Sequence, residues 1–250
     1  MKNLLDVRGL SKRFGGLTAV SDISFSMKRG EIFGIIGPNG AGKTTLFNVI
    51  AGQHKASAGG VTFDERDISG YSSDAIARLG IGRTFQAVTV FKSETVAENL
   101  RRANVLRRRH NPLAVRSAAA SEDRFRAVAS FIGLGDHLDG VAGDLAYGLQ
   151  KLLGVGMAML IEPKLLLMDE PAAGLNPSEK REAGTLIRRL RDELGISILL
   201  IEHDMPLVMD VCDRILVMSQ GAKVALDTPS EIKRDSRVID AYLGDDYDFA

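Results

Sequence analysis

The stretch that decides the fold is Gly37-Pro38-Asn39-Gly40-Ala41-Gly42-Lys43-Thr44. It matches the pattern G-x-x-x-x-G-K-[ST] at every fixed position, follows an apolar run at 32–36 and precedes apolar residues at helical spacing. A glycine-rich loop between a strand and a helix turns backbone N–H groups around phosphate oxygens, and the helix dipole favours the anion. The sequence therefore predicts a nucleotide site in which Lys43 contacts the β- and γ-phosphates and the Thr44 hydroxyl is a ligand of Mg²⁺.

A second apolar run, at 165–168, ends in two acids, Asp169 and Glu170. Open parallel sheets bind their ligands beyond the carboxyl ends of the strands, so we expect both carboxylates beside the phosphates. Asp169 suits the Mg²⁺ shell, and Glu170 can accept a proton from the water that attacks the γ-phosphate. Taken alone, the pair is equally consistent with a solvated strand end. The complete phosphate-binding loop earlier in the chain favours the catalytic interpretation.

Further apolar runs, at 198–201 and 215–218, are typical of parallel strands that are covered on both faces. A helix before the first of them is well marked, because Asn176 can cap it, Glu179 stands three residues after the cap and Gly195 can stop it. Its predicted apolar stripe is Ala183, Leu186, Ile187, Leu190 and Leu194. We therefore predict an α/β fold with a mostly parallel core sheet flanked by helices.

The stretch from about 94 to 143 interrupts this alternation of strands and helices. It has little strand character, and Phe125, Val128, Ala129 and Ile132 recur at helical spacing, so we predict a helical insertion. Its local basic excess consists of Arg101, Arg102, Arg107, Arg108, Arg109 and Arg116. A solvated helix face is the ordinary explanation of such a run, and contact with a partner protein or an acidic surface is the alternative.

The composition limits the partners of the chain. Its 250 residues suit one large domain, and the net charge of zero creates no global field that would attract nucleic acid, so we expect no nucleic-acid partner. No stretch reaches the ~18 apolar residues of a membrane span. Asp6 and Arg8 interrupt the apolar core that an export signal needs. The single cysteine, Cys212, excludes an intrachain disulfide and fits a reducing cytoplasm.

These features together resemble the ATP-binding subunits of ABC transporters, over nearly the whole chain. Besides the two nucleotide-binding motifs, the matching runs are Arg83-Thr84-Phe85-Gln86 at the Q-loop, Leu145-Ala146-Tyr147-Gly148-Leu149-Gln150 at the signature position, Ala173-Gly174-Leu175-Asn176 at the D-loop, and Glu202-His203-Asp204 at the switch histidine. The resemblance implies a P-loop NTPase fold with an N-terminal antiparallel β region. It also implies a single domain, 1–250, with a core at 1–93 and 144–250 and a helical subdomain at about 94–143.

The resemblance assigns a role to each matching residue. Lys43, Glu170, Gln86 and His203 are the implied catalytic residues; Phe14 stacks on adenine. The implied ligands of Mg²⁺ are Thr44, Gln86 and Asp169. The implied contacts of ATP are Gly37, Pro38, Asn39, Gly40, Ala41, Gly42, Lys43, Thr44 and Thr45, and Ala146 and Gly148 contact the ATP that the opposite subunit holds. ATP and Mg²⁺ are thus the expected substrate and cofactor.

Finer matches are similar to the ATPase subunits of branched-chain amino acid importers. They lie at 82–86, 169–177, 201–205 and 237–244. The same subgroup includes transporters of urea, amides and aromatic acids, so the cargo stays open. The ATPase of lipopolysaccharide exporters has a similar tail, but the runs Arg-Thr-Phe-Gln and Ala-Ala-Gly-Leu-Asn-Pro favour the importers.

The signature departs from the family's common Leu-Ser-Gly-Gly-Gln. Ala146 lacks the serine hydroxyl, Tyr147 replaces a glycine, Leu149 replaces the glutamine and Met157 stands where arginine is frequent. Gly148 still permits a close approach of the backbone. Leu149 and Met157 leave open an alternative function, a nucleotide-gated interaction module with little hydrolysis.

The resemblance also implies partners. Two such subunits sandwich ATP head to tail, so a second ABC ATPase subunit, identical or different, is expected. The other expected partners are transmembrane permease subunits and, indirectly, an extracytoplasmic solute-binding protein. This chain is expected to be peripheral at the cytoplasmic face of the cell membrane. A soluble ABC ATPase that acts on DNA or ribosomes fits less well, since tandem cassettes or a long coiled coil do not fit in 250 residues. A GTPase is disfavoured because the chain has no Asn-Lys-x-Asp run.

Overall fold

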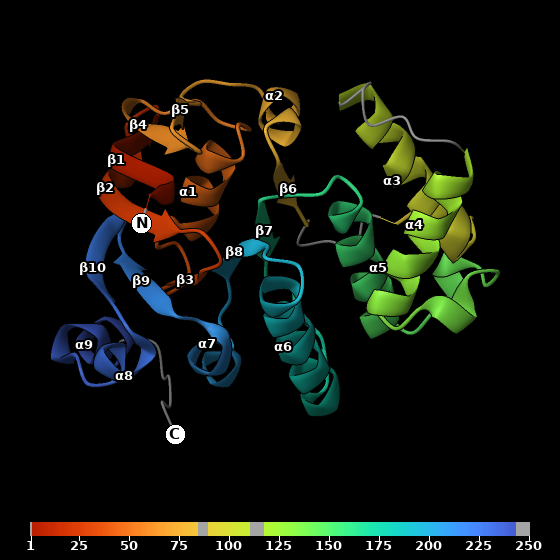
Figure 1. Cartoon of the computed structure of the whole chain (residues 1–250). Coiled ribbons are helices and arrows are strands. Elements are labelled where there is room, and N and C mark those ends of the chain that lie inside the picture. Colours follow the sequence, from red (N-terminus) through yellow and green to blue (C-terminus); the bar gives the residue numbers. More distant parts are fainter. Residues whose placement is uncertain (1, 85–89, 111–117, 244–250) are drawn as a thin grey trace.

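Two β-sheets and the helices around them make up the fold (Figure 1). The computed structural model describes residues 2–84, 90–110 and 118–243. The N-terminal antiparallel sheet has the order β2-β1-β4-β5, with strands β1 (Asn3–Phe14), β2 (Leu17–Lys28), β4 (Ala58–Phe63) and β5 (Arg66–Asp67). The larger sheet has the order β10-β9-β3-β8-β7-β6, with strands β3 (Ile32–Ile36), β6 (Ile81–Arg83), β7 (Leu165–Asp169), β8 (Ser197–Ile201), β9 (Arg214–Ser219) and β10 (Ala222–Asp227).

The larger sheet is mostly parallel, as predicted. β9, β3, β8, β7 and β6 pair in parallel with their neighbours, and β10 pairs antiparallel with β9. β8 lies between β3 and β7, and its last residue, Ile201, is level with both Ile35 and Asp169. The loop after β3 and the acids at the end of β7 therefore emerge at one edge of the sheet, on the two sides of β8.

Side chains of the parallel strands alternate between two buried clusters. In β7, Leu165 and Leu167 pack with α1 and the antiparallel sheet, whereas Leu166 and Met168 pack with the helices on the opposite face. β3, β8 and β9 divide their side chains in the same way. Because both faces are covered, every residue of β3, β7 and β8 is buried. This double burial explains why these strands are continuous apolar runs in the sequence.

The helices connect the strands and cover the sheets. They are α1 (Lys43–Ile50), α2 (Ser73–Arg78), α3 (Val96–His110), α4 (Ala118–Phe131), α5 (Tyr147–Met159), α6 (Pro177–Asp192), α7 (Met205–Val211), α8 (Pro229–Ile232) and α9 (Ser236–Leu243), with short 3₁₀ turns at Gly135–His137 and Ala142–Asp144. In the described part of the chain, no helix combines the length and the apolar character needed to cross a membrane.

The predicted insertion is helical. α3 and α4 lie with α5 at one end of the molecule, away from the antiparallel sheet (Figure 1). Phe125, Ala129 and Ile132 are buried in this group, as their spacing predicts. Two arginines of the basic segment pair within the insertion, Arg101 with Glu122 and Arg102 with Glu94. Arg116 and the side chains of Arg107, Arg108 and Arg109 lie outside the described residues.

α6 begins as predicted. The Asn176 side chain accepts hydrogen bonds from the N–H groups of Ser178 and Glu179, and Glu179 accepts one from the Asn176 N–H, so the capping box is complete. The prediction that Leu194 belongs to the apolar stripe is wrong. α6 ends at Asp192, so Leu194 lies in the turn before Gly195, whose φ is +67°, and is exposed.

Candidate functional site

The loop between β3 and α1 depends on two glycines. Gly42 has a φ of +93°, and a Cβ at this position would lie 2.3 Å from the Ala19 carbonyl oxygen. Gly37 has a φ of +150°, and its Cβ would lie 2.0 Å from the Met218 carbonyl oxygen. Neither position accepts a side chain, so the loop packs tightly against neighbouring backbone. At Gly40 a Cβ would meet nothing within 4 Å, so this side of the loop is open to a ligand.

Lys43, the first residue of α1, connects the loop to the acids at the end of β7. Its side chain is buried, and Nζ donates to the carbonyl oxygens of Gly37 at 2.6 Å and Pro38 at 3.0 Å. Burial lowers the pKa of Lys43, while the negative charges of Glu170 and Asp169 act to raise it. The structure thus brings both carboxylates within electrostatic reach of the lysine, although β8 separates the two strands. Thr44 and Thr45 follow on α1, exposed and half-buried.

Asp169, the last residue of β7, is 3% exposed. Its Oδ2 lies 3.4 Å from Nη2 of Arg83, at the end of β6, and among the described residues its buried Oδ1 has no hydrogen-bond partner. Burial raises the pKa of Asp169; Arg83 opposes this rise and Glu170 adds to it. No role of Arg83 is predicted from the sequence, although this residue belongs to the run that ends in Gln86. Gln86 itself lies outside the described residues.

The geometry of Asp169 fits a hydrated cation. Mg²⁺ keeps several waters and is usually held by one or two carboxylates together with substrate phosphates. The buried Oδ1 of Asp169 can accept a hydrogen bond from such a water. Within the described ranges, no group of three or more His, Cys, Asp or Glu residues could hold a metal. Phosphate oxygens and the Thr44 hydroxyl would therefore complete the shell.

Glu170 has an unusual backbone conformation for a residue with a side chain. Its φ is +49°, in the left-handed region, and its N–H donates to the Ile201 carbonyl oxygen at 2.9 Å. The carboxylate Oε1 lies 3.8 Å from Nδ1 of His203, the second residue after β8. The structure therefore brings His203, Glu170 and Asp169 together at the sheet edge that Lys43 faces.

Two residues that the sequence analysis did not assign hold the turn after Asp169. Lys151 of α5 donates from Nζ to the carbonyl oxygens of Glu170 at 2.9 Å and Pro171 at 3.1 Å. Glu202, 1% exposed, accepts from the N–H groups of Ala172 at 2.7 Å, His203 at 3.1 Å and Asp204 at 3.4 Å. Lys151 has no sequence signal beyond its place in a helix. Glu202 has a weak one, since it is an acid directly after a buried strand.

The signature segment lies at the start of α5. Ala146 is the N-cap residue, and a Cβ on Gly148 would lie 2.8 Å from Oε1 of Glu179. The exposed Tyr147 ring lies beside Gly174, whose Cβ would be 3.1 Å from Cε1 of the ring. The segment thus packs on the D-loop and the start of α6 of its own chain. Figure 1 shows α5, which begins with this segment, on the other side of β6 and β7 from α1, which begins with Lys43.

Phe14 is the last residue of β1 and is 43% exposed. Its ring makes an edge contact with the His54 ring at 5.3 Å between centroids, and the Lys12 ammonium lies 4.7 Å from its centroid. An exposed ring of this kind can stack on a base, and the adenine contact of Phe14 stays a prediction.

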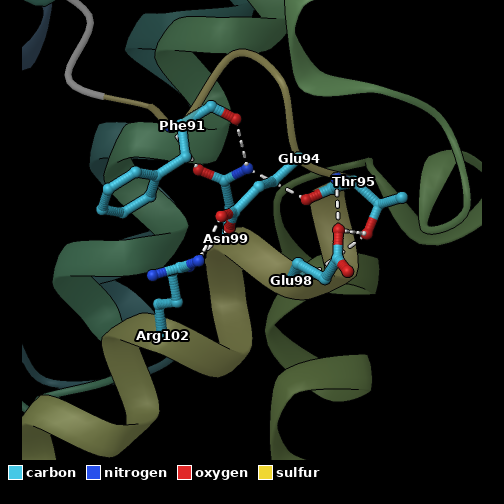
Figure 2. A network of polar contacts seen from close by, with 6 residues as sticks. All are labelled: Phe91, Glu94, Thr95, Glu98, Asn99 and Arg102. Atoms are coloured by element: carbon cyan, nitrogen blue, oxygen red, sulfur yellow. Dashed lines mark hydrogen bonds and ion pairs between the residues drawn. The ribbon is translucent and has the colours of Figure 1, made fainter.

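The chain at 91–95, which follows the segment that contains Gln86, is anchored to α3. Figure 2 shows the Asn99 side chain between the backbones of Phe91 and Thr95. Its Oδ1 accepts from the Phe91 N–H at 2.7 Å, and its Nδ2 donates to the carbonyl oxygens of Phe91 at 3.1 Å and Thr95 at 2.9 Å. Arg102 pairs with Glu94, and its guanidinium lies 4.8 Å from the centroid of the exposed Phe91 ring. Asn99 is fully buried, so this junction is rigidly fastened to the insertion.

A cavity of about 480 Å³ lies between α5 and the segment that contains α2 and β6. Ile76 of α2 and Ile81 of β6 line one side, and Leu152 and Val155 of α5 line another. Arg83, which contacts Asp169, also lines it. The cavity therefore reaches from Arg83, beside Asp169, to α5, and Ala103 of α3 also lines it.

The chain is similar to known proteins over most of its length. Residues 20–173 match the family model described as ABC transporter, and residues 222–248 match one described as branched-chain amino acid ATP-binding cassette transporter. The high-affinity branched-chain amino acid transport ATP-binding protein LivG of Salmonella typhimurium is 44% identical, over 97% of this chain and 98% of LivG. The lipopolysaccharide export system ATP-binding protein LptB of Escherichia coli is 35% identical, over 97% of this chain and 98% of LptB.

Solved structures agree on the fold. MJ1267, an ATP-binding cassette of an ABC transporter whose crystal structure is in the ADP conformation, has a TM-score of 0.85 and 31% identity, covering 98% of this chain and 100% of MJ1267. The dimeric structure of the cassette MJ0796 bound to ADP and Pi has a TM-score of 0.78 at 21% identity, which supports the fold alone.

Proposed function

The chain belongs to the ABC transporter family, and on that premise we propose that it is the ATP-hydrolysing subunit of an importer of branched-chain amino acids or a related small polar solute. The observation that carries the proposal is the meeting of three segments at one sheet edge: the loop 37–44, the acids Asp169 and Glu170, and His203. Phosphate binding, charge stabilisation and activation of water are the three tasks of ATP hydrolysis, and this edge offers a group for each.

The residues divide the work of hydrolysis. The N–H groups of the loop and the Lys43 ammonium hold the phosphates, with the lysine donors now on Gly37 and Pro38 available to phosphate oxygens. Bound Mg²⁺, held by Thr44 and Asp169, would neutralise charge on the β- and γ-phosphates. Glu170 accepts the proton of the attacking water, and His203, 3.8 Å away, orients the carboxylate and the γ-phosphate.

A head-to-tail partner would complete the site. The signature segment of this chain packs next to Gly174 and Glu179. A second ATPase subunit, identical or different, would bring its signature to the ATP held here, and this chain would do the same in return. The site of one chain is therefore half of a functional unit.

The cavity between α5 and the segment that contains α2 and β6 is the place where we expect a permease subunit to act. The lining of this cavity is largely apolar and includes Arg83. A permease segment bound there would contact the arginine that pairs with Asp169. Such a contact would attach this chain peripherally at the cytoplasmic face of the membrane.

The relatives support an amino acid importer over an exporter. LivG is named for branched-chain amino acid transport and is more similar to this chain than LptB, which is named for lipopolysaccharide export. The match at residues 222–248 also bears the branched-chain description. Leu149 and Met157 motivated the alternative of a module with little hydrolysis. Both pack against the buried cluster on the face of the large sheet opposite α1. Their apolar character thus has a structural use.

The test of hydrolysis uses Glu170→Gln in the assembled transporter. We expect ATP to bind with unchanged affinity, turnover to fall at least about a hundredfold, and an ATP-dependent dimer to accumulate on gel filtration. Glu193→Gln, an equal change at an exposed residue of an ion pair with Arg189, serves as the control. Unchanged turnover in Glu170→Gln would remove the proposed base, and negligible wild-type turnover would favour the interaction module.

The cargo needs a separate experiment. Reconstituted transporter with its solute-binding protein should take up labelled leucine in the presence of ATP, and unlabelled isoleucine and valine should compete. Competition by urea or an aromatic acid instead would reassign the cargo within the subgroup.

A further inference from the structure

The turn at 170–172 needs support from its surroundings. Glu170 has a φ of +49°, a conformation that costs a residue with a Cβ about 1 kcal/mol. Such a conformation persists only where neighbouring groups hold it. The direction of the Glu170 carboxylate follows from this backbone, so whatever holds the turn also aims the carboxylate.

One support comes from α5. Lys151 lies one helical turn after Tyr147, and its Nζ donates to two consecutive carbonyl oxygens, those of Glu170 and Pro171. Burial lowers the pKa of Lys151, and the charges of Glu202 and Glu170 act to raise it. Its ammonium also lies 5.5 Å from the centroid of the Tyr147 ring. A half-buried lysine with carbonyl acceptors is fixed in position far better than an exposed one.

The other support comes from the end of β8. The Glu202 carboxylate accepts from the Ala172 N–H with Oε1 and from the His203 N–H with Oε2. It thus joins the turn after Asp169 to the segment that carries His203. The charges suit the dipoles: a cation on the carbonyl side of the turn and an anion on the amide side.

We propose that Lys151 and Glu202 are positioning residues that clamp the turn 170–172 from both sides, and that Lys151 makes the aim of Glu170 depend on the placement of α5. The inference rests on the proposed role of Glu170 as the base. Because α5 also carries the signature segment, a movement of this helix against the sheet shifts the Glu170 carbonyl and with it the carboxylate. Hydrolysis is then coupled to the position of the helical group through one hydrogen-bonded lysine.

The test compares Lys151→Met, which keeps the aliphatic stem but loses the charge and the donors, with Lys151→Arg, which keeps both. In the assembled transporter we expect kcat of Lys151→Met to fall between about 10- and 100-fold, as a small misplacement of a catalytic group does, and Lys151→Arg to recover most of it. The KM for ATP should change less than about twofold, because Lys43 is untouched. Affinity of the single chain for a fluorescent ATP analogue should be unchanged.

Glu202→Gln provides an independent arm. One end of the amide can still accept from Ala172, but the NH₂ end then faces the N–H of His203, so kcat should again fall while ATP affinity stays. A double-mutant cycle adds the decisive comparison. If Lys151 acts through Glu170, Lys151→Met should reduce turnover by a much smaller factor in the Glu170→Gln background than in the wild type.

Three results would overturn the clamp: wild-type turnover in Lys151→Met and Glu202→Gln, equal loss in Lys151→Met and Lys151→Arg, or full additivity with Glu170→Gln. Glu170→Gln alone separates this failure from failure of the proposed function. If Glu170→Gln is inactive and Lys151→Met is fully active, the clamp is wrong and the base stands. If Glu170→Gln is active, the base is wrong too.

Discussion

The buried side-chain amide of Asn99 uses both its acceptor and its donor, and a substitution can test the donor separately. Its Oδ1 accepts from the Phe91 N–H, and its Nδ2 donates to the carbonyl oxygens of Phe91 and Thr95. Asn99→Asp keeps the shape and the acceptor but replaces the NH₂ group by an oxygen. Figure 2 shows Nδ2 of Asn99 facing the carbonyl oxygens of Phe91 and Thr95, so at neutral pH the new oxygen would carry negative charge against both.

The magnitude follows from the three hydrogen bonds. At about 1 kcal/mol each, Asn99→Ala should lose about 3 kcal/mol, which for a chain of this size lowers Tm by about 6–12 °C. Asn99→Asp should lose at least as much at pH 7, because a buried carboxylate against two acceptors adds repulsion to the lost bonds. Protonation restores a donor, so the folded state raises the pKa of this carboxyl above the unfolded value of about 3.9.

The sign of the pH dependence follows. A raised pKa in the folded state means that the stability of Asn99→Asp, relative to wild type, is highest below about pH 4 and falls as the pH rises through the folded-state pKa. Urea unfolding of Asn99→Asp and wild type at a series of pH values from about 4 to 7 measures the difference in the free energy of unfolding. Asp123→Asn, an exposed change on the neighbouring helix α4, should change the free energy of unfolding by less than about 0.5 kcal/mol and serves as control. A loss in Asn99→Asp that is the same at every pH would refute the placement of Nδ2 against the carbonyls.

Three further predictions concern the loop, a helix cap and the thiol. Gly42→Ala should abolish ATP binding in a nucleotide titration, because its Cβ would lie 2.3 Å from backbone oxygen, whereas Gly154→Ala in α5, whose Cβ would meet nothing within 4 Å, should still bind. Asn176→Ala should lower the free energy of unfolding by about 1 kcal/mol in a urea titration, through loss of the capping box, and equal stability would contradict that contact. Cys212 is 7% exposed and burial raises the pKa of its thiol, so iodoacetamide should modify it only after unfolding; rapid modification of the native chain would disprove its burial.

The sequence predicted those parts of the fold whose environment is uniform. β3, β7, β8 and β9 are buried on both faces, so an apolar run marks each of them. β6 has only three residues, and pairing with β7 rather than its own composition makes it a strand. Leu194 was placed on a helix face because its spacing fits, but the chain leaves the helix two residues earlier.

The candidate site was predictable where a local motif specifies the backbone. The loop 37–44 and the pair after β7 are contiguous in sequence, and their chemistry is written in the residue types. Lys151, Glu202 and Asn99 act on main-chain groups of segments 8 to 30 residues away, and any residue type presents the same main-chain groups. No pattern of side chains therefore marks these contacts, and only the tertiary structure reveals them.

The alternation of side chains between two buried clusters fixes the register of the strands in the larger sheet. A slip of β8 by one residue against β3 and β7 would exchange Leu199 and Ile201 with Ile198 and Leu200, and so spoil both cores at once. A single-residue deletion in β8 should therefore destabilise the packing on both faces of the sheet. The distance between the phosphate loop and the acids is consequently fixed by the register of β8 against β3 and β7.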